Sequence, residues 1–135
     1  MKKFTSTKQK LGQIGETLAV MFLVKRGFAV VERNYTKPYG EIDIVARGTE
    51  KIHFIEVKSV SYETKSVMEI AVSHGTWRPE ENVHYEKQKR MSRVIETWLA
   101  ENSYVGKWQI DILSVRIVPR ERIARFNIID NVIFE

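Results

Sequence analysis

The 135-residue sequence contains no cysteine. Disulfides, thiolate zinc sites and cysteine nucleophiles are therefore excluded, and the composition fits a reducing cytoplasm. Long apolar runs are missing too, because the longest, Leu18 to Val24, is far shorter than the ~20 residues of a membrane-spanning helix. The basic N-terminus is not followed directly by the apolar stretch of a signal peptide. We therefore expect a cytoplasmic protein with no membrane segment.

Repeats, low-complexity tracts and linkers are also absent, so we predict one domain over residues 1–135 with a mobile basic lead-in at 1–8. Two of the three histidines, His74 and His84, are spaced too widely for a metal site made of histidine alone, and we expect them at the surface. The net charge is +5. A basic surface fits a nucleic acid partner, because phosphate contacts supply much of such affinity, but it equally fits a merely soluble basic protein.

Apolar periodicity predicts two helices and five strands. The helices are expected over about 9–27 and 85–102, and the strands over 28–35, 40–46, 52–58, 108–117 and about 124–129. The first helix has an apolar stripe that includes Ile14 and Met21, and it should end at Gly27. A neighbouring stripe of small and apolar residues, with Ala19 and Leu23, should pack against another element. Residues 67–72 fit a short strand or a helical turn. The fold class is therefore α/β (α+β), in the order α-β-β-β-α-β-β, with a mixed central sheet flanked by helices.

Charged residues interrupt two of these apolar strands. Asp43 lies between Ile42 and Ile44, and Glu56 and Lys58 share one face of the next strand by the two-residue period. Charges in buried strands cost desolvation energy. Mg²⁺ or Mn²⁺ would offset that cost, because Mg²⁺ takes oxygen ligands and usually one or two carboxylates.

These residues suggest metal-assisted hydrolysis of a phosphodiester. Asp43, Glu56 and the carbonyl of Val57 could hold the metal, and Lys58 could orient or deprotonate a water or offset phosphate charge. Glu16, on a small and apolar stripe of the first helix, could bind a second metal, hold a ligand water or pair with Lys58. The competing interpretations are a cross-strand ion pair and, for Glu16, a favourable interaction with the helix dipole.

Five other features point towards contacts rather than chemistry. Basic residues crowd the start of the second predicted helix, which indicates either a phosphate-binding surface or a solvated face. Trp77 beside Arg78 could stack on a base or anchor a loop. Trp98 lies on a core stripe, and Asp111, out of phase with its apolar neighbours, is expected to make a structural hydrogen bond. Glu41 is expected to be a solvated charge at the rim.

The ordered set of motifs resembles a known family. The matching residues are Gly12-x-x-Gly15-Glu16 with Ala19, Gly27, Asn34, Gly40-Glu41-Ile42-Asp43, Phe54-Ile55-Glu56-Val57-Lys58, Pro79-Glu80-Glu81-x-Val83 with Lys87-Gln88, and Asp111. Together they resemble the YraN family of the PD-(D/E)XK, restriction-endonuclease-like superfamily, similar to archaeal Holliday junction resolvases.

The resemblance implies a restriction-endonuclease-like core and a Mg²⁺-dependent nuclease-like activity on DNA, including branched or structured DNA. It implies Glu16, Asp43, Glu56 and Lys58 as the site, with Lys87 or Gln88 as supporting contacts to phosphate or water. The basic start of the helix adds Lys89 and Arg90 as candidate nucleic acid contacts. A two-fold homodimer would suit a four-way junction with two symmetric cuts. The alternatives are a non-catalytic nucleic-acid-binding module on the same fold and a structural or partner-binding protein.

Overall fold

The computed structural model describes residues 7–73 and 85–132. In these ranges the chain forms α1 (Thr7–Lys25), β1 (Ala29–Lys37), β2 (Gly40–Arg47), β3 (Lys51–Ser61), α2 (Lys65–Ser73), α3 (Tyr85–Glu101), β4 (Lys107–Val118), the short 3-10 helix η2 (Pro119–Glu121) and β5 (Ile123–Ile129). None of these helices is both long enough and apolar enough to cross a membrane.

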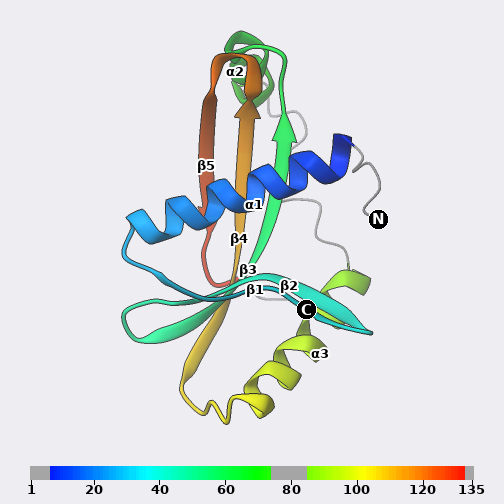
Figure 1. Ribbon diagram of the computed structural model, residues 1–135, viewed down its shortest axis with the longest axis vertical. Coiled ribbons are helices and arrows are strands. Elements are labelled where there is room, and N and C mark those ends of the chain that lie inside the picture. The colour runs from blue at the N-terminus through cyan, green and yellow to red at the C-terminus, as the bar shows by residue number, and fades with distance from the viewer. Residues whose placement is uncertain (1–6, 74–84, 133–135) are drawn as a thin grey trace, which may run out of the picture.

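The five strands form one mixed sheet in the order β1-β2-β3-β4-β5. The first three strands are an antiparallel meander, β4 joins β3 in parallel, and β5 returns antiparallel to β4. Helices α1 and α3 pack on opposite faces, each over its own apolar cluster, and lie on either side of the β1–β2 hairpin in Figure 1. The predicted α+β architecture with a mixed sheet is confirmed.

The predicted element order was wrong at one place, because residues 65–73 form the helix α2. The observed order is α-β-β-β-α-α-β-β. The helix begins where Thr64 Oγ1 accepts a hydrogen bond from Val67 N at 3.1 Å, and Met68 is its buried anchor. An apolar run this short fits a strand and a helix equally by periodicity, so the sequence could not decide between them.

Helix α1 ends as predicted. Gly27 adopts φ +93°, and Phe28 N donates to Leu23 O at 3.0 Å across it. This is the glycine-terminated helix end in which the left-handed residue lets the next amide reach back to an orphan carbonyl. The turn sends the chain directly into β1.

The buried side of α1 is the predicted stripe of small and apolar residues, whereas part of the other apolar stripe is exposed. Ile14 and Met21 are 51% and 60% exposed, while Gly15, Ala19 and Leu23 are buried against the sheet. Apolar residues surround much of this helix, so its 3.6-residue period does not select one face. The small residues determine which face of α1 is buried, since they allow the helix backbone to approach the sheet closely.

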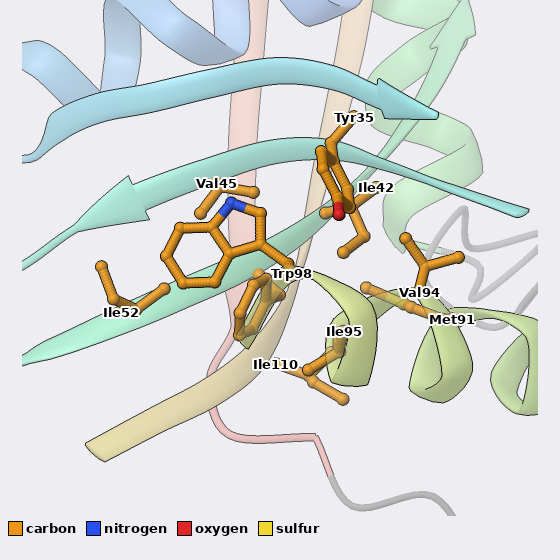
Figure 2. Close-up of a cluster of buried hydrophobic side chains, with 10 residues drawn as sticks. Tyr35, Ile42, Val45, Ile52, Met91, Val94, Ile95, Trp98 and Ile110 are labelled. Atoms are coloured by element: carbon orange, nitrogen blue, oxygen red, sulfur yellow. The ribbon is translucent and has the colours of Figure 1, made fainter. Parts of the chain in front are cut away.

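The core beneath α3 has Trp98 at its centre (Figure 2). Its ring meets Phe54 edge to face at a centroid distance of 5.4 Å, and Trp98 Nε1 donates to Glu32 Oε1 at 3.2 Å. Such an edge-to-face pair stabilises the core beyond what the area buried by the two rings contributes. The predicted packing role of Trp98 is confirmed.

A charged cluster ties β1 to the end of α3. Glu101 accepts hydrogen bonds from the Tyr35 hydroxyl and, at 2.8 Å, from Lys37 Nζ. The Lys37 hydrogen bond, followed by that of Tyr35, lowers the pKa of Glu101, and the same bond raises the pKa of Lys37. The pKa of Tyr35 is raised mainly by the burial of its hydroxyl, and next by the hydrogen bond to Glu101.

Candidate functional site

The site lies where β2 separates from β3. Backbone pairing between these strands runs from Arg47↔Ile52 to Ile44↔Ile55 and does not include Asp43. Instead, Val57 N donates to Asp43 Oδ2 at 2.8 Å. A side-chain carboxylate thus takes the place of a backbone acceptor, which fixes Asp43 at the fork between the two strands.

A kink in the β1–β2 hairpin explains how Asp43 reaches the fork. Asn34 adopts φ +52°, a left-handed conformation that asparagine tolerates better than most residues. On β2, Ile44 packs on the α1 side, yet Ile42, two residues earlier, packs with Tyr35 on the α3 side. Strict two-residue alternation would place both isoleucines on one face. The strands therefore turn over at Asn34 and Asp43, and Asp43 comes to lie between the faces.

Glu56 and Lys58 lie on the α3 side of β3. Glu56 is 3% exposed, and Lys58 Nζ lies 3.4 Å from Glu56 Oε1. The lysine side chain is 18% exposed, so the pair is mostly removed from water. A buried carboxylate needs such a cation or another charge partner.

Glu16 lies on the α1 side and is held by β1. Arg33 Nε is 3.4 Å from Glu16 Oε1, and the glutamate side chain is 12% exposed. The described structure pairs Glu16 with Arg33 and Lys58 with Glu56. The neighbouring Gly15 sets the depth of the helix, since a Cβ there would lie 1.8 Å from Ser59 Oγ.

Two cavities meet at Asp43. The larger, about 770 Å³, is lined by Glu16, Arg33, Asn34, Glu41, Asp43 and Val57 among others. The smaller, about 200 Å³, is lined by Gly40, Glu41, Asp43, Glu56, Arg90 and Met91. Asp43 is thus brought together with Glu16 on one side and with Glu56 on the other.

The predicted nucleic acid contacts fall on the first turns of α3. Arg90 is exposed and lines the smaller cavity beside Glu56, whereas Lys89 is exposed away from either cavity lining. Lys87 and Gln88 belong to the helix, but their side chains lie outside the described part of the structure. His74, Trp77, Arg78 and His84 also lie outside it.

The candidate metal ligands at the fork are all oxygen atoms. Among residues 7–73 and 85–132, no three His, Cys, Asp or Glu side chains gather into a metal-holding group. The carboxylates of Asp43 and Glu56 on one cavity, with the backbone carbonyl of Val57 nearby in sequence, match the one or two carboxylates that Mg²⁺ usually takes alongside water. Asp43 Oδ2 also accepts the hydrogen bond from Val57 N.

Sequence reasoning missed Arg33, the kink at Asn34 and the contact of Gly15 with Ser59. Arg33 looked like an ordinary strand charge, and only the fold brings it to Glu16. An asparagine four residues before a Pro-x-Gly turn was the one available signal for the kink. Glu41, expected at the rim, is exposed there and lines both cavities.

The fold and the site define a small α+β protein with two carboxylates lining one cavity at a sheet fork. The sequence pattern of the uncharacterised protein family UPF0102 matches residues 15–129, and the chain belongs to that family. This confirms the YraN part of the resemblance. A UPF0102 protein of Moorella thermoacetica is 36% identical over 126 residues, 93% of this chain and 96% of its own. One from Nocardia farcinica is 37% identical over 118 residues, 85% and 83% of the two chains.

Proposed function

We propose that this protein is a metal-dependent nuclease of the PD-(D/E)XK type that hydrolyses phosphodiester bonds of DNA. The observation that carries the proposal is the cavity shared by Asp43 and Glu56 at the strand fork, with Lys58 held 3.4 Å from Glu56. Two carboxylates and a lysine on diverging strands are the parts that metal-assisted phosphodiester hydrolysis needs.

Each residue has a distinct role in this proposal. Asp43, Glu56 and the Val57 carbonyl would hold Mg²⁺ or Mn²⁺, which when bound supplies Lewis-acid polarisation and an acidified water. Lys58 would orient an attacking water or offset the charge that builds on the phosphate. Arg90 lies at the mouth of the same cavity, where its guanidinium could clamp a phosphate. Glu16, held by Arg33, faces the larger cavity and would position a water or a second ion.

The second candidate is a non-catalytic nucleic-acid-binding module. It is favoured by the ion pair itself, because Lys58 offsets the charge of the buried Glu56 without any metal. The exposed basic residues Lys89, Arg90 and Arg93 on α3 and the net charge of +5 would serve it equally well.

A cleavage assay separates the nuclease from the non-catalytic binding module. It uses Mg²⁺ or Mn²⁺ with linear duplex, single-stranded, flap and four-way DNA. Asp43→Asn is the sharpest variant, because the amide oxygen can still accept from Val57 N while the charge is lost. We expect the wild type to cut at least one substrate and Asp43→Asn to lose about 100-fold or more of the rate. Glu41→Gln is the matched control, since Glu41 lines the same cavities but is exposed and is assigned no role.

Lys58→Ala needs a folding check by circular dichroism, because it leaves Glu56 buried without this cation. If the wild type binds DNA but cuts none of the substrates, the enzyme is refuted and the binding module stands. If it binds no DNA either, both candidates are wrong. Equal loss of activity in Glu41→Gln and Asp43→Asn would refute the assignment of the site.

A further inference from the structure

A second polar cluster lies on the α1 side of the sheet and takes no part in the proposed cleavage. Asp111 is fully buried on β4, and its Oδ1 accepts from Gln109 Nε2 at 2.7 Å and from Asn131 N at 2.9 Å. Its Oδ2 lies 2.7 Å from His53 Nδ1 on β3. The structural hydrogen bond predicted for Asp111 is confirmed. A carboxylate this buried requires donors on both oxygens, so His53 presents its Nδ1–H to Asp111.

The other nitrogen of His53 faces a pocket. With Nδ1 turned to Asp111, Nε2 points towards the β2–β3 turn, where a Cβ built on Gly48 would lie 2.8 Å from it. The ring of Phe28 holds the imidazole edge to face, with centroids 4.9 Å apart. The imidazole is therefore oriented by a buried acid and an aromatic ring while one nitrogen stays available to a ligand.

That pocket, about 240 Å³, also has Arg26 and Lys51 in its wall, with Glu50 as its acidic residue. In the described structure, Lys51 Nζ donates to an amide oxygen, that of Gln109, at 2.9 Å. The Arg26 guanidinium carbon lies 5.1 Å from the centre of the Phe22 ring. Both of these contacts are to neutral groups, so they leave the positive charge of Arg26 and Lys51 uncancelled beside the pocket that both residues line.

We propose that this pocket binds the oxyanion of a phosphate group. Arg26 and Lys51 supply donors that carry positive charge. His53 Nε2 donates as imidazolium, or accepts from a P–OH group as neutral imidazole. One histidine and one glutamate are too few for a transition-metal site, which makes an anion the better match to the wall. The ligand is either free phosphate or a phosphate of a nucleic acid backbone.

The phosphate bound in this pocket would differ from the phosphate that is cleaved at the proposed site on the strand fork. The two places are ten residues apart along the chain of α1: Glu16 in the helix lines the larger fork cavity, and Arg26, directly after the helix, lines this pocket. Ten residues of helix span about 15 Å. Binding here needs neither metal nor cleavage, so the inference stands or falls apart from the proposed nuclease.

The test follows the His53 ring nitrogens by ¹H–¹⁵N NMR during titration with sodium phosphate, against sodium chloride at equal ionic strength. We expect a saturable shift of Nε2 with phosphate only. Arg26→Ala should raise the Kd about fivefold, the scale of one charge contact at a partly exposed site. Lys25→Ala is the matched control, because Lys25 is the adjacent exposed cation, is not in the pocket wall and should bind as the wild type does.

Gly48→Ala is a second, steric probe, since its methyl group would occupy the space in front of Nε2. The methyl group must displace the His53 ring or the turn, and either change should weaken phosphate binding. A duplex oligonucleotide in a second titration identifies the source: a shift at lower concentration than inorganic phosphate, and reversed by it, marks a backbone phosphate. A shift with inorganic phosphate alone marks a small phosphate ligand. No saturable shift with either, or equal weakening by Lys25→Ala and Arg26→Ala, overturns the proposal.

Discussion

Replacing Gly15 by alanine tests the close approach of α1 to β3 on which the position of Glu16 depends. The added Cβ would lie 1.8 Å from Ser59 Oγ and 2.8 Å from Ser59 Cβ. The hydroxyl can rotate away, but the Cβ is fixed to the strand backbone, so the helix itself must move. Overpacking costs typically 1–3 kcal/mol, and these two contacts place it near the upper end, about 3 kcal/mol.

Gly12→Ala is the matched control in the same helix. A Cβ at Gly12 meets nothing within 4 Å, so this variant should gain the helix propensity of alanine over glycine, about 1 kcal/mol. The same gain applies to Gly15→Ala and leaves it about 2 kcal/mol less stable than the wild type. The propensity cancels between the variants, so their difference of about 3 kcal/mol measures the contact with Ser59.

Urea unfolding followed by circular dichroism gives the free energy of unfolding of each variant. The double variant Gly15→Ala/Ser59→Gly removes the obstructing side chain, and its stability should exceed the sum of the two single changes. If Gly15→Ala and Gly12→Ala prove equally stable, α1 does not approach β3 at Gly15 and the account of the larger cavity fails.

Three further predictions concern stability. Asp111→Ala should cost about 3 kcal/mol in urea unfolding, because buried donors lose their acceptor, and a loss below about 1 kcal/mol would contradict the network. Gly27→Ala should cost about 1 kcal/mol, since alanine is strained at φ +93°, and an unchanged Tm would show that the helix does not end there. Glu101 has a lowered folded pKa, so its stabilisation is present above the unfolded carboxyl pKa and is lost as pH falls through the folded value. The stability difference between wild type and Glu101→Gln should therefore shrink on acidification through that window, and a constant difference would refute the Lys37 and Tyr35 contacts as its cause.

The sequence by itself determined the five strands, the helices α1 and α3, and the charged positions within them. Alternation located the strands that carry Asp43, Glu56 and Lys58, Gly27 marked the end of α1, and the phase of Asp111 indicated a structural hydrogen bond. These features follow from local periodicity and from the cost of burying charge, both of which can be evaluated along the chain.

Only the tertiary structure decided how these residues meet. The left-handed Asn34 turns both hairpin strands over, which no regular two-residue period describes, and so places Asp43 between the two faces of the sheet. Arg33 reaches Glu16 across 17 residues, and His53 reaches Asp111 across 58. Contacts over such separations depend on strand order and helix depth, which are set by packing and not by the residues nearby in sequence.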